Sequence, residues 1–293
     1  MSSTVFDRAL LRRRRQRAWA GAPVRFLVAH ATDDLVERLS TVVRRFPLAL
    51  DLGTPDGAAA AALRRHAAVD TVIATSSWPH AGAQVVAEEE ALPFAAESLD
   101  LVASVMALHL VNDLPGALVQ IRRALKPDGL FLAALAGGAT LTELRQAFAA
   151  AETEIEGGVS PRVAPFADVR ELGSLLQRAG FALPVTDVDR LTVRYDNAFA
   201  LMQDLRRMGV TNVLTERRRT PLRRATLMRM AEIYAERFAD ADGRIRATVE
   251  IVWLSGWAPH ESQQKPLRPG SAQARLADAL GTEEHSAGDK TGR

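Results

Sequence analysis

The sequence predicts an α/β fold with a mostly parallel sheet, and three observations carry this prediction. Short apolar runs rich in β-branched residues alternate with helical patterns along most of the chain. The run at residues 99–106 is almost wholly apolar, as expected for a central parallel strand that is covered on both faces. The run at residues 46–52 leads into a glycine-containing turn and then an alanine-rich helix, which is a strand–turn–helix unit.

Two helices are expected ahead of the sheet. Residues 5–19 have helical composition, and Asp33 with Asp34 is expected to open a second helix, because the apolar residues after them recur at helical spacing. The first four strands are expected at residues 46–52, 69–75, 84–87 and 99–106. A helix at residues 115–125 is expected to stop at the Lys-Pro-Asp-Gly turn of residues 126–129.

The second half of the chain begins with strand five, expected at residues 130–135. An amphipathic helix follows, and Thr140 is expected to cap it together with Glu143, three residues on. Another helix is expected at residues 168–179, ending at Gly180.

The last two strands are expected to form an antiparallel hairpin, with the last strand antiparallel to an otherwise mostly parallel sheet. They cover residues 185–195 and 245–254. The chain between them is largely helical in composition and too long for a structureless loop, which predicts a small helical insertion between strands six and seven.

This reading divides the chain into five segments. They are an N-terminal helical cap (1–45), a core (46–195), the helical insertion (196–244), the last core strand (245–260) and a polar C-terminal segment (261–293). Charged and small residues dominate from about residue 281, where we expect disorder.

Composition excludes several classes of protein. The chain contains no cysteine, so it has no disulfide, thiolate zinc site or cysteine nucleophile, and a reducing, cytoplasmic location is expected. No apolar run approaches the roughly 20 residues that a membrane span needs. The net charge of +2 is too balanced to imply nucleic-acid binding, which is therefore not expected.

Arginine is unevenly spread, with clusters at residues 12–17 and 217–229. These clusters favour solvated helix faces, and binding of nucleic acid or an acidic protein is the less common explanation. The first cluster also resembles a transit peptide in composition, but Asp7 and the lack of a secretory apolar region favour a basic surface helix.

Three phrases resemble the class I S-adenosylmethionine-dependent methyltransferase family. They are Asp51-Leu52-Gly53, Leu92-Pro93-Phe94 with Ser98-Leu99-Asp100, and the Lys-Pro-Asp-Gly turn. The resemblance implies a Rossmann-like, seven-stranded methyltransferase sheet, S-adenosylmethionine as cofactor and methyl transfer by in-line displacement at the methyl carbon.

A narrower resemblance extends over nearly the whole chain. It rests on Ala107-Leu108-His109 with Asn112-Asp113, Gly137-Gly138, Ser160-Pro161-Arg162, residues 191–195 and residues 261–266. These phrases are similar to the group that contains the mitochondrial complex I assembly factor with arginine hydroxylase activity and its bacterial relatives. More distantly, the chain resembles the malonyl-carrier-protein methyltransferases of biotin synthesis. The resemblance implies a protein substrate or assembly partner.

The family pattern also implies the cofactor-binding residues. The first turn is matched by Asp51, Gly53 and Gly57, the ribose-binding position after strand two by Ser76, and the adenine side by Glu88 and Glu89 within Glu88-Glu89-Glu90.

Two of these positions depart from the family pattern. Pro55 replaces the middle glycine of the first turn and has no N–H to offer a carboxylate. Ser76 stands where a carboxylate accepts hydrogen bonds from both ribose hydroxyls. Three interpretations therefore stay open: a methyltransferase, an arginine hydroxylase, or a non-catalytic assembly protein that has lost the cofactor.

His109 is the candidate catalytic residue. It follows strand four, where its side chain is expected near the transferred group and could act as a base at neutral pH. A half-buried, hydrogen-bonded histidine is the competing interpretation. Asp113 is expected to cap the next helix. The histidines show no metal-binding spacing, so no metal site is predicted.

Overall fold

A computed structural model describes residues 4–264 and 281–282 of the protein. Residues Met1–Pro259 form one compact unit, and His260–Arg293 form a second one. Disorder was expected from about residue 281, a stretch that falls almost wholly outside the described residues. The helices and strands named below lie in the first unit.

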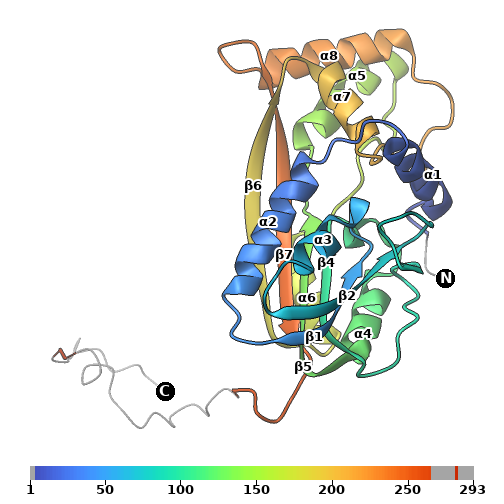
Figure 1. Ribbon diagram of the computed structural model, residues 1–293. Helices are drawn as coiled ribbons and strands as arrows, with labels where there is room; N and C mark the ends of the chain where they lie inside the picture. The colour runs from blue at the N-terminus through green and yellow to red at the C-terminus, as the bar shows by residue number, and fades with distance from the viewer. Residues whose placement is uncertain (1–3, 265–280, 283–293) are drawn as a thin grey trace. The chain divides into compact units, whose positions relative to one another are not determined.

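A seven-stranded sheet lies at the centre of this unit (Figure 1). The strands are β1 (Phe46–Leu52), β2 (Val69–Ser76), β3 (Val85–Val86), β4 (Leu99–Val105), β5 (Leu125–Ala136), β6 (Ala182–Tyr195) and β7 (Ile245–Trp257). Their order across the sheet is β3-β2-β1-β4-β5-β7-β6, and β7 runs antiparallel to both of its neighbours. The predicted fold class, with its antiparallel last strand, is confirmed.

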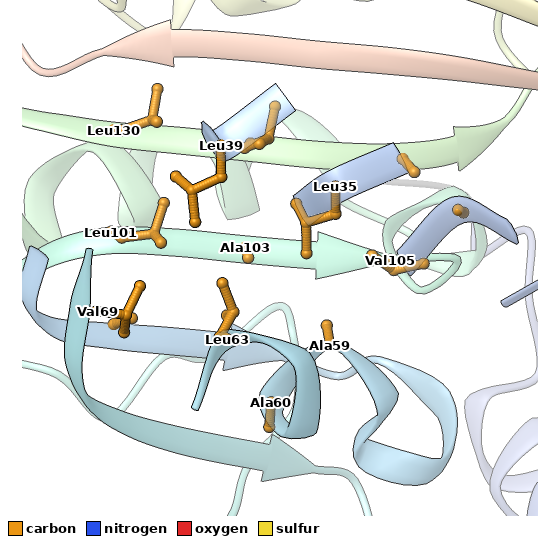
Figure 2. Packing of buried hydrophobic residues seen from close by; sticks show 14 of the residues in the cluster. Leu35, Leu39, Ala59, Ala60, Leu63, Val69, Leu101, Ala103, Val105 and Leu130 are labelled. Carbon is orange, nitrogen blue, oxygen red and sulfur yellow. The ribbon is translucent and has the colours of Figure 1, made fainter. Parts of the chain in front are cut away.

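Helices cover both faces of the sheet. The helices are α1 (Arg8–Trp19), α2 (Phe26–Ser40), α3 (Ala58–Leu63), α4 (Leu114–Ala124), α5 (Thr142–Glu156), α6 (Val169–Arg178), α7 (Ala198–Arg207) and α8 (Arg224–Phe238). One apolar core lies between the sheet and α2 with α3, where Leu35, Leu39 and Leu63 approach Leu101 and Ala103 of β4 (Figure 2). A second core lies under α4 and α6 on the opposite face. Burial on both faces explains the unbroken apolar run of β4.

The predicted helical insertion is present between β6 and β7. Its helices α7 and α8 pack against α5 in a core of their own (Figure 1). The insertion leaves and rejoins the sheet at one place, because Tyr195 at the end of β6 pairs with Ile245 at the start of β7. The Tyr234 hydroxyl donates a 2.9 Å hydrogen bond to the carbonyl oxygen of Arg246, which fixes α8 to β7.

The second helix begins earlier than predicted. It starts at Phe26, so Asp33 and Asp34 lie inside α2 rather than at its beginning. The buried stripe of α2 already includes Ala31, and Asp34 is stabilised within the helix by an ion pair with Arg38 at 3.1 Å. An acidic pair on an exposed helix face was therefore mistaken for a helix start.

Thr140 does not cap α5. The helix begins at Thr142, after Leu141 in the left-handed conformation. The Thr140 hydroxyl instead exchanges 3.0 Å hydrogen bonds with the backbone of Glu250, while Glu143 accepts hydrogen bonds from Thr248. Contacts with β7 thus replace the local capping box. The expected cap at Asp113 does form, because Asp113 accepts from Gly116 N–H. At α6, Asp168 and Glu171 make a capping box that was not predicted from the sequence.

The Lys-Pro-Asp-Gly turn lies within β5 rather than before it. The strand pairing shifts between Leu99–Leu125 and Leu101–Leu130, which inserts extra residues on β5. Asp128 takes a positive φ of 63° in this bulge. The predicted turn is therefore real, but strand pairing continues on both sides of it.

Candidate functional site

The turn after β1 is the geometric centre of the candidate site. Gly53, Asp56 and Gly57 all have positive φ angles, of 72°, 66° and 62°. The turn is fixed to β4, because the Ser104 hydroxyl donates to the Leu52 carbonyl at 2.8 Å and the Thr54 hydroxyl accepts from Val105 N–H at 3.0 Å. The turn therefore lies at the carboxyl ends of β1 and β4, where ligands bind in open α/β sheets.

Asp51 lies beneath this turn and is only 1% exposed. Its Oδ2 accepts a 2.8 Å hydrogen bond from Ala60 N–H, in the first turn of α3, while its Oδ1 has no hydrogen-bond partner among the described residues. Burial raises the pKa of Asp51 to about 6, against the opposing effects of the nearby Thr54 and of the Ala60 N–H. Asp51 thus shapes the turn, while one of its oxygen atoms is buried without a hydrogen-bond partner among the described residues.

Gly53 and Glu89 meet in space. A Cβ atom at Gly53 would lie 2.5 Å from Oε1 of Glu89, so the carboxylate rests on the glycine itself. Glu89 is 1% exposed, and its Oε1 has no hydrogen-bond donor among the described residues. Only a glycine permits this approach. Gly57 lies in the same turn, where its Cβ would be 3.3 Å from the carbonyl oxygen of Gly82.

Arginines of α1 bind the acidic loop. Arg8 contacts Glu88 at 2.7 Å and also Glu89, and it donates to the Leu110 carbonyl at 3.1 Å. Arg12 contacts Glu88 as well. Burial opposes ionisation of Glu88, but the hydrogen bonds and charges of Arg8 and Arg12 prevail and lower its pKa. The expectation of a wholly solvated basic helix is therefore wrong for this face of α1, because the acidic triplet lies opposite it.

Ser76 ends β2 and is 5% exposed. Its hydroxyl lies 3.4 Å from the amide nitrogen of Trp78, a weak hydrogen bond that helps to hold the following turn. Its carbonyl oxygen accepts from Ala87 N–H at 3.0 Å, which joins the turn to the chain leading to Glu88.

A cavity of about 1040 Å³ opens beside the turn. Its lining is largely apolar and comes from the β1 turn, α1, α2, the end of β4, α5 and the helical insertion. Of the predicted site residues, only His109 lines it among the described residues, although Pro55 and Asp56 do so from the turn. The structure therefore brings His109 and the turn residues Pro55 and Asp56 to one cavity, whereas Asp51, Gly53, Gly57, Ser76, Glu88 and Glu89 do not line it.

His109 lies in a short 3₁₀ helix (Leu108–Leu110) and packs edge-on against Phe166, with ring centroids 5.5 Å apart. Its Nδ1 is shielded from solvent and has no partner among the described residues. Burial, reinforced by the charges of Arg15 and Arg8, lowers its pKa to about 3. The ring is therefore neutral at physiological pH and too weak a base for the proton removal that the sequence suggested.

Several residues around the cavity were missed by reasoning from sequence. They are Arg15 and Trp19 of α1, Trp78 after β2, Phe148 of α5 and Arg162. For Arg15 a signal existed, since Arg8, Arg12 and Arg15 follow one another by four and three residues, on one helical face with Leu11. Arg162 contacts buried Glu152 and lies 5.5 Å from the Phe148 ring, which fixes the Ser160-Pro161-Arg162 loop at the rim.

The site suits S-adenosylmethionine in three respects. The glycine turn lies at the carboxyl ends of β1 and β4, Asp51 and Glu89 each keep an oxygen atom without a hydrogen-bond partner among the described residues, and the adjacent cavity can hold the amino-acid portion and an acceptor side chain. Within residues 4–264 and 281–282 no group of three His, Asp or Glu side chains is placed to hold a metal ion. Over the same residues, no helix combines the length and apolarity needed to cross a membrane.

Comparison with known proteins supports the same assignment. Residues 50–133 match a methyltransferase domain family. The fold is similar to a Bacillus halodurans protein described as a methyltransferase (TM-score 0.51, 17% identity, covering 78% of this chain and 98% of that one) and to the Bacillus subtilis YcgJ protein (TM-score 0.53, 16% identity, 79% and 99%). The methyltransferase domain supports S-adenosylmethionine binding in general.

Curated relatives match over nearly the full length. The mitochondrial arginine-hydroxylase NDUFAF5 of Homo sapiens is 41% identical over 288 residues, covering 94% of this chain and 83% of the human protein. The Danio rerio protein of the same name is 39% identical and covers 94% of this chain and 89% of its own. The malonyl-[acyl-carrier protein] O-methyltransferase of Xylella fastidiosa is 33% identical over 87% of this chain and 89% of its own.

These relatives correct one expectation. Absence of cysteine led us to expect a cytoplasmic protein, but the NDUFAF5 relatives are named as mitochondrial, which contradicts that location. The error has a physical reason, because a lack of disulfides does not distinguish one compartment from another. The identity and coverage of the relatives establish that the chain belongs to the family of methyltransferase-domain proteins that includes the arginine-hydroxylase NDUFAF5 proteins.

Proposed function

We propose that the protein binds S-adenosylmethionine at the turn after β1 and acts on a side chain of a protein substrate during assembly of respiratory complex I. The observation that carries this proposal is the cavity of about 1040 Å³ that opens directly beside the glycine turn. It is large enough for the amino-acid end of the cofactor together with one substrate side chain. The family resemblance supports the assembly role.

The cofactor, when bound, supplies an electrophilic methyl group. The protein's own residues would hold and orient the reactants. Gly53 lies in the turn at which the nucleoside would bind, and Asp51 keeps that turn in shape through α3. Oε1 of Glu89, which has no hydrogen-bond donor among the described residues, would accept a hydrogen bond from a hydroxyl or amine of the nucleoside. His109, neutral and facing the cavity, offers a hydrogen bond that orients the acceptor.

Arginine hydroxylation is the second candidate activity, favoured by relatives of about 40% identity that carry this name. The charge of the cavity bears on this choice. Its charged lining consists of Asp56 and the arginines 14, 15, 162, 206 and 207. A substrate guanidinium would meet like charge there. Its recognition would therefore require carboxylates from the substrate protein itself, or Glu88 and Glu89 freed from their ion pairs with α1.

Binding and product mass test these candidates separately. Calorimetry with S-adenosylmethionine should give low-micromolar binding, whereas no heat at millimolar ligand would favour a non-catalytic assembly protein. Mass spectrometry of a complex I subunit after incubation should show added methyl groups. With dioxygen and a reductant supplied in the same incubation, an added oxygen atom in place of a methyl group would establish the hydroxylase activity instead.

A further inference from the structure

Arg15 of α1 is a buried cation with few acceptors. It is 5% exposed, and such arginines are rare unless they are paired. Its Nη2 lies 3.4 Å from the Met106 carbonyl oxygen, its Nη1 lies 3.8 Å from Glu89, and its Nε has no acceptor among the described residues. A guanidinium has five N–H donors, so most of its hydrogen-bonding capacity is unused by the contacts described.

The charges around Arg15 do not balance. Three guanidinium groups, those of Arg8, Arg12 and Arg15, face two carboxylates, those of Glu88 and Glu89. The shorter contacts to both carboxylates come from Arg8 and Arg12, which leaves one positive charge in excess at the buried end of the cluster. Burial and the repulsion of Arg8 lower the pKa of Arg15, against the attraction of Glu89 and Glu88. An anion at Arg15 would neutralise this excess charge.

The segment after α7 packs against the backbone of Arg15. Gly209, at the end of α7, has φ +74°, and a Cβ atom there would lie 3.0 Å from the Cα of Arg15 and 3.2 Å from its backbone nitrogen. This close approach lets the helical insertion pack directly against α1. Arg15 is thus presented to the cavity from a helix whose backbone packs against the turn after α7.

The turn after β1 lines another part of the same cavity and lacks one backbone hydrogen-bond donor. Pro55 and Asp56 line the cavity, and Pro55 has no backbone N–H. The only anionic group of S-adenosylmethionine is the carboxylate of its methionine portion. A guanidinium binds a carboxylate through two parallel, charge-assisted hydrogen bonds. This pairing is stronger than hydrogen bonds from neutral backbone N–H groups and can replace them.

We propose that Arg15 binds the carboxylate of S-adenosylmethionine and takes over the role of the amide that Pro55 removes. This inference rests on the proposed function, because it requires the cofactor to extend from the Gly53 turn into the cavity. It assigns α1, an element outside the sheet, a direct part in cofactor binding. The buried excess charge at Arg15 and the missing donor at Pro55 then have one explanation.

Calorimetry with two ligands tests the assignment. S-adenosylmethionine carries the carboxylate, whereas 5′-methylthioadenosine has the same nucleoside and sulfur but no amino-acid portion. Arg15→Met, which fills much of the same volume, should weaken S-adenosylmethionine binding by about 10- to 100-fold and leave methylthioadenosine binding within about 3-fold. Arg15→Lys should keep part of the affinity, because it retains the charge but not the fork.

Arg13→Met is the matched control, since Arg13 lies on the exposed side of the same helix. It should leave the affinities of both ligands unchanged, and thermal unfolding should show that all variants fold. Equal weakening of both ligands in Arg15→Met would mean a merely structural role, and unchanged S-adenosylmethionine affinity would overturn the inference. If the wild-type protein bound methylthioadenosine but not S-adenosylmethionine, the proposed function and the inference would both fail.

Discussion

His109 lies where β4 ends, with its ring against Phe166 and its Nδ1 shielded from water. Burial keeps the ring uncharged, because a proton would have to be held away from water. The positive charges of Arg15 and Arg8 act in the same direction. A neutral imidazole donates one hydrogen bond and accepts another, which suits orientation of an acceptor group. The position of His109 suits a catalytic base, but its low pKa makes it a weak one. An orienting role is therefore the one that fits.

The pKa of His109 predicts how stability depends on pH. It is about 3 in the folded protein and 6.5 in the unfolded chain, so the unfolded chain is protonated first as the pH falls. The free energy of unfolding should therefore fall below pH 6.5, by up to about 1.4 kcal/mol per pH unit from this residue. His109→Gln should remove that part of the loss.

Comparison of His109→Gln with the wild-type protein in urea, from pH 7.5 to pH 5, measures this difference. The comparison is needed because Asp51 acts with the opposite sign. Its raised pKa of about 6 adds stability at low pH that is lost as the pH rises through 6. Parallel curves for the two proteins would show that His109 titrates normally in the folded state.

At the scale of elements, α1 and the acidic loop after β3 form one unit through their side chains. Arg8 joins Glu88, Glu89 and the Leu110 carbonyl, so it connects the first helix to the ends of two strands. Removing one partner of a buried ion pair leaves an uncompensated charge, which is costlier than the pair is favourable. The acidic loop thus depends on α1 for its neutralisation.

Arg8→Met should therefore lower the free energy of unfolding by about 3 kcal/mol, because Glu89 would remain buried without its principal cation. Arg13→Met on the exposed face should cost less than about 0.5 kcal/mol. Urea denaturation measures both. A small loss for Arg8→Met would mean that Arg15 moves in to neutralise Glu89.

The two departures from the family pattern lie in the turn after β1, at Pro55, and at the end of β2, at Ser76. Pro55→Gly restores an N–H, and Ser76→Asp supplies a carboxylate for the ribose hydroxyls. The double variant should raise the affinity for S-adenosylmethionine about 10-fold by calorimetry. Each single variant serves as its control, and unchanged affinity in the double variant would place the cofactor away from this turn.

Most elements were predictable because their patterns are local. Buried strands such as β1, β2 and β4 are visible in the sequence as apolar runs. The helix caps at Asp113 and Asp168 are also local, because each accepts a hydrogen bond from a residue three positions on. Thr140 misled because its partner, Glu250, is remote in sequence. The candidate site was predictable only in part. The turn was located from a local motif, whereas the cavity was not, because its walls come from many separated segments.

At the scale of the whole first unit, the helical insertion and the N-terminal helices meet at Gly209. Gly209→Ala should lower the free energy of unfolding by about 2 to 4 kcal/mol, from the positive φ and from the 3.0 Å approach to Arg15. It should also weaken S-adenosylmethionine binding, because Arg15 would shift. Denaturation and calorimetry together measure these effects.

Gly243→Ala is the matched control for this variant. Gly243 has φ +81°, but nothing among the described residues lies within 4 Å of its Cβ position. Its cost should be limited to about 1 kcal/mol of backbone strain, with cofactor affinity unchanged. Equal losses in the two variants would show that the close approach of Gly209 to Arg15 adds nothing to the cost of the substitution.

The pairing of Tyr195 with Ile245 has an evolutionary consequence. A segment that departs and returns at facing positions of one hairpin behaves as a cassette, since its exchange leaves the register of the other strands untouched. Yet this cassette supplies a wall of the cavity through residues such as Phe199 and Leu222. Substitutions confined to residues 196–244 can therefore reshape one wall of the cavity while the turn after β1 and the register of the sheet stay unchanged.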